Sequence, residues 1–272
     1  MNTQQTILPA NGFSPPDTFL SGQCFRWDEQ PDGSFCGIVS GKVLNVLRRE
    51  EQLVVSGVAP QDFASLGFPQ YFDLKRDYGA IARELAALSP VMRQACALVP
   101  GVRILRQDPW ETLCSFIISQ NNNIPRIKGI IARLCKLFGE PCGKGHFSFP
   151  GPQTLAAQTP ETLAPLRSGF RAKYLLDAAQ KVASGALPLS VLAEAPLPEA
   201  RRMLQTVNGV GPKVAECVLL YGCGRLEAFP VDVWIGRAMA QLFPGKAPDF
   251  FGPHAGIAQQ YLFCYCRAIK LK

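Results

Sequence analysis

The stretch Val207-Asn-Gly-Val-Gly-Pro-Lys-Val-Ala-Glu-Cys217 places a lysine directly after a tight glycine turn. The segment Phe229-Pro-Val-Asp-Val-Trp234 then places an aspartate among apolar residues, 19 positions after that lysine. The apolar residues on both sides of the turn predict a helix, a hairpin and a second helix between residues 204 and 221. Such a corner brings a cation and a fixed carboxylate into a predominantly apolar surrounding.

Gly209 and Gly211 allow positive φ and a close approach of the backbone, and Val210 between them is expected to plug the hairpin into the core. The amides of such a turn, together with the N-terminus of the next helix, favour a phosphate oxygen. An ordinary helix–turn–helix corner uses the same glycines. The turn alone therefore leaves both a structural and a DNA-binding interpretation open.

Lys213 and Asp232 add chemistry to this turn. Lys213 lies in the first turn of its helix, where the dipole disfavours a cation and partial burial favours the neutral, nucleophilic amine. The alternative is a solvated lysine that binds phosphate. Asp232 is expected to cap the helix 233–242 at its N-terminus, and a carboxylate there can also stabilise an oxocarbenium-like sugar.

Composition narrows the class of protein. The chain has 272 residues, of which 47% are hydrophobic, so a packed core is expected. The net charge of +7 suits a polyanionic partner. The ten cysteines lack disulfide or metal-site spacing, and no signal peptide or bilayer-spanning run is visible. We therefore expect free thiols, a reducing compartment, no metal, no cofactor and no membrane association.

The periodicity of the chain changes near residue 100. Short β-prone runs occupy 33–40, 42–47 and 52–56, and helical periodicity begins after Tyr71. Helices are expected at 153–158, 160–166, 171–184, 197–206, 212–222 and 253–269, and another is expected to begin near Pro125. The fold class is α+β, with an antiparallel sheet domain over residues 1–100 and an all-helical domain over residues 101–272.

The quoted motifs resemble those of the helix-hairpin-helix (HhH-GPD) DNA glycosylases. Segments 21–27, 101–109, 114–126 and 252–263 are further similar to the 8-oxoguanine DNA glycosylase/AP lyase family, eukaryotic-type enzymes with bacterial relatives. The resemblance implies a TBP-like N-terminal sheet domain. It also implies that the protein is located in the bacterial cytoplasm, at the nucleoid, or in the nucleus if the source is eukaryotic.

The resemblance implies a catalytic pair. The lysine at the position of Lys213 attacks the sugar C1′ and expels the damaged base, and the Schiff base that forms permits β-elimination of the 3′ phosphate. The aspartate at the position of Asp232 assists that step. Both roles agree with the interpretation reached from the residues themselves.

The resemblance also implies a pocket for the flipped base. Gln259 and Phe263 share a helix face and would read and stack on 8-oxoguanine, with Cys217 on its other face. The carbonyl of Gly22 would accept the N7–H that guanine lacks. A half-buried helix with a core phenylalanine is the alternative for Gln259 and Phe263.

Four residues resemble those that hold the DNA around the lesion. Asn121, Arg126 and Arg171 would bind the cytosine left behind, and Phe170 would take the place of a wedging tyrosine. A turn or cap role is the alternative for Asn121. A solvated face or a phosphate contact is the alternative for Arg126 and Arg171.

Two positions depart from the family pattern. Trp234 stands where many relatives have a histidine, so no phosphate-binding or proton-transfer role is carried over. Asn208 replaces a proline before the hairpin glycines, which is expected to loosen the turn slightly.

The resulting hypothesis is a monomeric bifunctional enzyme that excises 8-oxoguanine opposite cytosine from duplex DNA and cleaves the strand. One alternative is a related glycosylase for another lesion, such as an alkylated purine. The other is a non-catalytic helix-hairpin-helix DNA-binding module.

Overall fold

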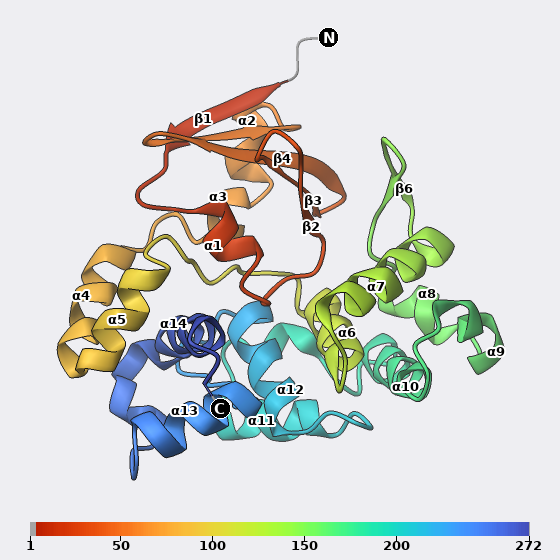
Figure 1. Ribbon diagram of the computed structural model, residues 1–272. Helices are drawn as coiled ribbons and strands as arrows, with labels where there is room; N and C mark the ends of the chain where they lie inside the picture. Colours follow the sequence, from red (N-terminus) through yellow and green to blue (C-terminus); the bar gives the residue numbers. More distant parts are fainter. Residues whose placement is uncertain (1–3, 272) are drawn as a thin grey trace.

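The computed structural model describes residues 4–271, with an antiparallel sheet at one end of the molecule and helices forming the remainder (Figure 1). Residues 1–3, which contribute to the expectation that no signal peptide is present, lie outside the described residues. The α+β class predicted from the sequence is confirmed.

The sheet has five antiparallel strands in the order β1-β5-β4-β3-β2. The predicted strands are confirmed as β3 (Phe35–Val39), β4 (Lys42–Arg49) and β5 (Gln52–Ser56). The edge strands β1 (Gln5–Pro9) and β2 (Trp27–Glu29) were not predicted. Alternate residues of β3 are buried, as expected for a sheet that packs on one face.

Aromatic side chains fill the space beneath the sheet. The Phe19 ring stacks on Trp27 with 4.1 Å between centroids, and Phe35 and Phe72 complete the group. Three short helices close this core: α1 (Pro15–Phe19), α2 (Pro60–Ser65) and α3 (Phe68–Tyr71). The connection between α1 and β2, which contains Gly22, lies on the side of this domain that faces the helices (Figure 1).

A second, larger core lies among the helices. The helices and their bounds are α4 (Tyr78–Leu88), α5 (Pro90–Leu98), α6 (Pro109–Ser119), α7 (Ile124–Phe138), α8 (Pro152–Ala156), α9 (Pro160–Leu163), α10 (Arg171–Ala183), α11 (Leu197–Gln205), α12 (Pro212–Cys217), α13 (Val233–Leu242) and α14 (Ala255–Ala268). Short 3-10 turns lie at Ala164–Leu166, Leu189–Val191 and Pro248–His254, and a two-stranded hairpin, β6 (Pro141–Gly143) and β7 (His146–Phe147), follows α7.

The division into two domains at residue 100 stays a prediction. Tyr78, Ile81 and Leu85 of α4 belong to the helical core although they precede residue 100 in the chain. The sheet core in turn includes Leu105. The segment 76–105 therefore contributes side chains to both cores.

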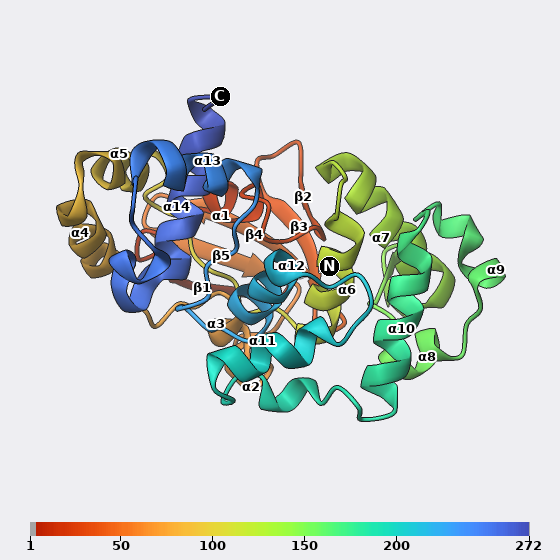
Figure 2. The same ribbon diagram turned by 90° about the horizontal axis from the view of Figure 1, so that it is seen from below.

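The helix-hairpin-helix lies where several helices converge. Seen from below, α12 occupies the middle of the molecule, with α11, α6 and α14 around it and α10 to one side (Figure 2). The chain after α12 continues as a π-helical turn, η3 (Val218–Gly222), which is fully buried. Helix α6 is buried on nearly all sides and packs against α12.

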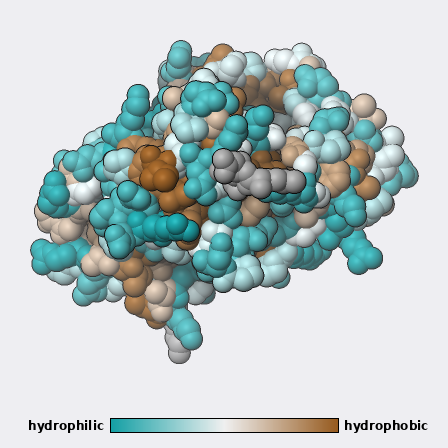
Figure 3. All heavy atoms as spheres, turned by 90° about the horizontal axis from the view of Figure 1, so that it is seen from above, coloured by the Kyte–Doolittle hydropathy of each residue, from teal (hydrophilic) through white to brown (hydrophobic). Residues whose placement is uncertain are grey.

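The opposite end of the molecule has a mixed surface. Figure 3 looks onto the sheet-bearing end and shows mainly hydrophilic atoms, with hydrophobic patches that are small and separated. Within residues 4–271, no helix has the length and apolar character needed to cross a membrane.

Candidate active site

The hairpin between α11 and α12 requires glycine at one position in particular. Gly209 has φ +79°, and a Cβ atom there would lie 2.4 Å from Cδ2 of Tyr174. Val210 is 6% exposed, which confirms that it inserts into the core. The turn is therefore fixed from beneath by Val210 and from the side by Tyr174.

Asn208 strengthens the hairpin rather than loosening it. Its backbone N–H donates to Oδ2 of Asp177 at 2.7 Å, a bond that proline could not make. The same carboxylate accepts from Nζ of Lys181 at 2.8 Å, and Lys181 also donates to the carbonyl of Thr206 at 2.6 Å. The turn is thereby tied to α10.

The hairpin presents unused backbone donors. Among the described residues, the amides of Gly209 and Gly211 have no hydrogen-bond acceptor, and α12 begins directly after Gly211 without a side-chain cap. Unpaired amides at a helix start favour an anion. This geometry suits a DNA phosphate.

Lys213 lies in the first turn of α12 with its side chain partly buried. Its Nζ lies 4.9 Å from the centroid of the Phe116 ring. Burial raises the pKa of the neighbouring Cys217 thiol to about 11, although the charge of Lys213 acts in the opposite direction. Cys217 is therefore a neutral neighbour of the amine at physiological pH, and no anion of this thiol competes for it.

Asp232 caps α13, as predicted. Its Oδ1 accepts from the backbone N–H of Ile235 at 2.9 Å, and the residue is partly buried. The preceding segment is fixed to α12, because Oε2 of the buried Glu216 accepts from the N–H of Phe229 at 2.7 Å. Arg201 donates to the other oxygen of Glu216. Glu216 thus links the helix of Lys213 to the segment that carries Asp232.

A cavity of about 70 Å³ brings the predicted catalytic and base-binding residues together. It is lined by Ser21, Gly22, Phe116, Lys213, Cys217, Tyr221, Pro230, Asp232, Gln259 and Phe263. All six residues predicted for catalysis and base recognition are in this list. Phe116, Tyr221, Ser21 and Pro230 were missed. Phe116 lies in a segment that carries the resemblance, but helical periodicity marks it only as core.

The cavity is smaller than an ordinary ligand pocket of about 300–1,000 Å³. Phe263 accounts for part of this. Its Cε1 lies 3.3 Å from the position that a Cβ of Gly22 would occupy, and Gly22 has φ +81°. The ring rests against the backbone that is predicted to read the base.

The three consecutive asparagines have separate roles. Nδ2 of Asn122 donates to the carbonyl of Ile118 at 3.0 Å, and Oδ1 of Asn123 caps α7 by accepting from Arg126 N–H at 3.0 Å. Asn121 is exposed with φ +47°, and its side chain has no partner among the described residues. Asn121 is therefore the asparagine that is available to DNA.

Arg171 and Arg126 face different environments. Arg126 is exposed, whereas Arg171 is 3% exposed and donates to the carbonyls of Gln120, Asn121 and Ser168. Burial lowers the pKa of Arg171, and the charge of Arg126 lowers it further. Arg171 thus supports the loop that displays Asn121, and its predicted contact with cytosine stays a prediction.

Phe170 is placed for a wedge. Its side chain is 49% exposed, and its ring meets the edge of Tyr174 at 5.8 Å between centroids. Because Tyr174 also contacts Gly209, the wedge and the hairpin share one support. Trp234, in the first turn of α13, lies under the guanidinium of Arg237 at 5.7 Å.

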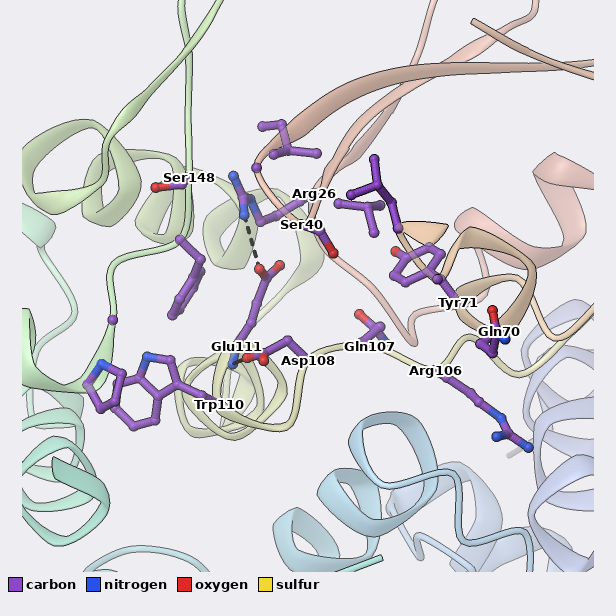
Figure 4. Close-up of a pocket in the computed structure, with 18 residues that line it drawn as sticks. Arg26, Ser40, Gln70, Tyr71, Arg106, Gln107, Asp108, Trp110, Glu111 and Ser148 are labelled. Atoms are coloured by element: carbon purple, nitrogen blue, oxygen red, sulfur yellow. Dashed lines mark hydrogen bonds and ion pairs between the residues drawn. The ribbon is translucent and has the colours of Figure 1, made fainter. Parts of the chain in front are cut away.

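A larger cavity, of about 550 Å³, lies elsewhere, between the sheet and the start of α6 (Figure 4). Arg26 and Glu111 form an ion pair of 3.0 Å there, and burial raises the pKa of Glu111 although Arg26 opposes that effect. This cavity and the one around Lys213 have no lining residue in common, so the two sites are separate. Within the described chain, no three metal-ligating side chains gather anywhere.

Comparisons with known proteins agree with this geometry. The family model "8-oxoguanine DNA glycosylase, N-terminal domain" matches residues 6–113, and the model "HhH-GPD superfamily base excision DNA repair protein" matches residues 114–249. The N-glycosylase/DNA lyase of Saccharomyces cerevisiae is 32% identical over 252 residues, which is 80% of this chain and 65% of the yeast protein. The chain thus spans slightly less than two thirds of that relative.

Solved structures extend the likeness to the whole chain. The structure of MBOgg1 in complex with a low-affinity DNA ligand has a TM-score of 0.94 and 45% identity, and the match covers 99% of this chain and 98% of that one. The Clostridium acetobutylicum 8-oxoguanine glycosylase/lyase, in complex with DNA containing cytosine opposite 8-oxoG, has a TM-score of 0.90 and 36% identity, covering 98% and 96%. From the matches over both cores, this chain belongs to the 8-oxoguanine DNA glycosylase family of HhH-GPD base excision DNA repair proteins.

Proposed function

We propose that this protein is a bifunctional DNA glycosylase and AP lyase that excises 8-oxoguanine paired with cytosine. The observation that carries the proposal is the single cavity in which Lys213 and Asp232 meet Gly22, Cys217, Gln259 and Phe263. The unpaired amides of the hairpin lie at the start of the helix that carries Lys213, where they hold the DNA phosphate. A DNA-binding module without catalysis has no need of a partly buried lysine and carboxylate beside a base pocket.

Lys213 is the nucleophile. Its neutral amine forms a bond to C1′ as the bond from C1′ to the base nitrogen breaks, and the base leaves with that electron pair and takes up the proton that the attacking nitrogen gives up. Opening of the sugar ring gives a Schiff base between Nζ and C1′. Loss of a proton from C2′ then breaks the C3′–O bond and releases the 3′ phosphate. Asp232 stabilises the positive charge that develops at the sugar.

Base recognition uses the remaining residues of the cavity. Gln259 reads the edge of the ring, and Phe263 and Cys217 lie on its two faces. The carbonyl of Gly22 accepts the N7–H of 8-oxoguanine, which guanine lacks. One such buried bond discriminates by about 1–3 kcal/mol.

The opposite strand is held by residues outside the cavity. Asn121 and Arg126 are exposed and read the cytosine, and Phe170 fills the gap left by the flipped base. Arg171 contributes to the same loop and contacts cytosine once its guanidinium exchanges a carbonyl for the base. The protein acts as a monomer in the compartment that holds the genome.

Borohydride trapping on duplex DNA with 8-oxoguanine opposite cytosine tests the proposal. A covalent adduct is expected with the unmodified protein and is expected to disappear in Lys213→Gln. Lys246→Gln is the matched control, because Nζ of Lys246 lies 5.0 Å from the Phe250 centroid, a similar contact far from the cavity. Excision that survives in Lys213→Gln without any adduct would contradict the lysine mechanism.

Lesion choice separates this proposal from a glycosylase for alkylated bases. Excision is measured on duplexes with each lesion opposite each of the four bases. Faster release of an alkylated purine than of 8-oxoguanine would favour the alternative enzyme.

A further inference from the structure

Three buried polar side chains lie together at one side of the base pocket: Tyr221 and Gln259 line it, and Gln260 lies behind them. Tyr221 comes from the π-helical turn η3, and Gln259 and Gln260 are neighbours on α14. Their exposed fractions are 5%, 4% and 1%. Only Gln259 carries a predicted role, so the function of the other two is unassigned.

The hydrogen bonds of Gln260 fix the direction of its carboxamide. Its Nε2 donates to the carbonyl of Ser21 at 3.0 Å and lies 3.7 Å from Sγ of Cys264. A carbonyl only accepts, so the nitrogen end of Gln260 faces Ser21. The oxygen end therefore faces Tyr221, whose hydroxyl donates to it at 2.7 Å.

Tyr221 then has no hydrogen left for Gln259. A hydroxyl carries one hydrogen and two lone pairs, and burial raises the pKa of Tyr221 well above 10, so the hydrogen stays in place. Oε1 of Gln259 lies 3.3 Å from the same hydroxyl, so with that hydrogen already used the contact brings two acceptors together. The lone pairs of Tyr221 are satisfied when the Nε2 end of Gln259 faces them, which a half-turn of the carboxamide achieves.

We infer that Gln260 and Tyr221 act as positioning residues that hold the Gln259 carboxamide with its oxygen towards the base. This rests on the proposed function. The Watson–Crick edge of 8-oxoguanine presents two adjacent donors, N1–H and the N2 amino group, and one carbonyl oxygen can accept from both. An adenine-type edge presents a bare N1 acceptor in the same place. The hydrogen-bonded chain of Gln260, Tyr221 and Gln259, called the relay below, thus selects a guanine-type ring. The Gly22 carbonyl selects its oxidised form.

The relay also joins the two recognition elements. Gln260 holds the carbonyl of Ser21, the residue before Gly22, although 239 positions separate the two residues. On the other side of the loop, Gln23 donates to Oγ of Ser21 at 3.0 Å. One set of hydrogen bonds therefore orients both the amide that reads the ring edge and the backbone that reads N7–H.

The test compares two substrates that differ by one donor. Single-turnover excision is measured for 8-oxoguanine and for 8-oxohypoxanthine, which lacks the N2 amino group, each opposite cytosine. For the unmodified protein we expect roughly tenfold slower excision of 8-oxohypoxanthine, as for one lost hydrogen bond. In Tyr221→Phe the 8-oxoguanine rate is expected to fall roughly tenfold, and the ratio between substrates to shrink to about twofold.

Tyr265→Phe is the matched control. Its hydroxyl donates to Oε1 of Gln94 at 2.6 Å from the same helix, α14, outside the cavity. This variant is expected to keep the tenfold ratio. Gln260→Leu is the second relay variant, and it tests the inference if Tyr221→Phe does not fold.

The outcomes separate the inference from the proposed function. No excision of either base by the unmodified protein would refute the function. Normal excision of 8-oxoguanine, with a tenfold ratio retained in Tyr221→Phe or Gln260→Leu, would refute the relay alone.

Discussion

Glu216 offers a test of how the catalytic pair is held together. Its side chain is buried, accepts from Phe229 N–H at 2.7 Å and pairs with Arg201. Replacing Glu216 by Ala leaves the buried N–H of Phe229 without an acceptor, which costs about 1–3 kcal/mol. Arg201 is 38% exposed, so the lost ion pair adds less than about 1 kcal/mol. We expect the free energy of unfolding to fall by about 1–4 kcal/mol.

The effect on catalysis follows from the position of the segment. Phe229 lies three residues before Asp232, so a released segment lets the carboxylate move relative to Lys213. Misplacement by about 1 Å slows a chemical step by roughly 100-fold. Single-turnover excision is therefore expected to slow by roughly 10- to 100-fold, while affinity for undamaged duplex changes little.

Urea unfolding and single-turnover kinetics measure the two effects. Glu216→Gln keeps an oxygen for the N–H of Phe229 and is expected to lose less than about 1 kcal/mol and little of the rate. Glu227→Ala removes an exposed carboxylate paired with Arg225 and controls for the change in net charge. Equal damage in Glu216→Gln and Glu216→Ala would refute the argument from the hydrogen bond.

Three further outcomes can be measured. Gly209→Ala, with φ +79° and a Cβ 2.4 Å from the Tyr174 ring, is expected to weaken binding to undamaged duplex at least tenfold, and wild-type affinity would contradict this. Phe170→Ala is expected to leave the thermal midpoint within about 2 °C, because half the side chain is exposed, yet to slow excision; unchanged excision would exclude a wedge. The free energy of unfolding, measured with urea, is expected to fall reversibly from about pH 9 to about pH 11. Burial raises the pKa of several thiols from 9.0 to about 11 or 12, so the unfolded chain loses those protons first. A flat profile would contradict this prediction. These thiols are Cys24, Cys96, Cys135, Cys217, Cys223, Cys264 and Cys266.

Local signals predicted the regular elements and missed the short ones. The runs that became β3, β4 and β5 alternate or carry β-branched residues, and the helices follow apolar periodicity. Strand β2 has three residues and the β6–β7 hairpin spans seven, too few for a pattern to develop. Their pairing depends on neighbours that are distant in sequence.

The same distinction holds in the site. Lys213, Asp232 and the hairpin glycines were identified because their motif is contiguous or nearly so. Glu216 and Tyr221 lie in the same stretch but resemble ordinary helix positions. No residue near them in the sequence indicates that Glu216 pairs with Phe229 or that Tyr221 bonds to α14. The expectation that Asn208 loosens the turn was wrong, because its N–H bonds to Asp177 on another helix.

The sequence by itself determined the α+β class, the hairpin and the capping role of Asp232, since these depend on backbone preferences and side chains within a few residues. Only the tertiary structure decided which asparagine side chain is left without a partner among the described residues, which carbonyls Arg171 donates to, and how Tyr221, Gln259 and Gln260 are linked. Hydrogen bonds are directional and each donor is used once, so their assignment requires every neighbour in space. The sequence gives the type of each residue but does not show which residues become its neighbours in space.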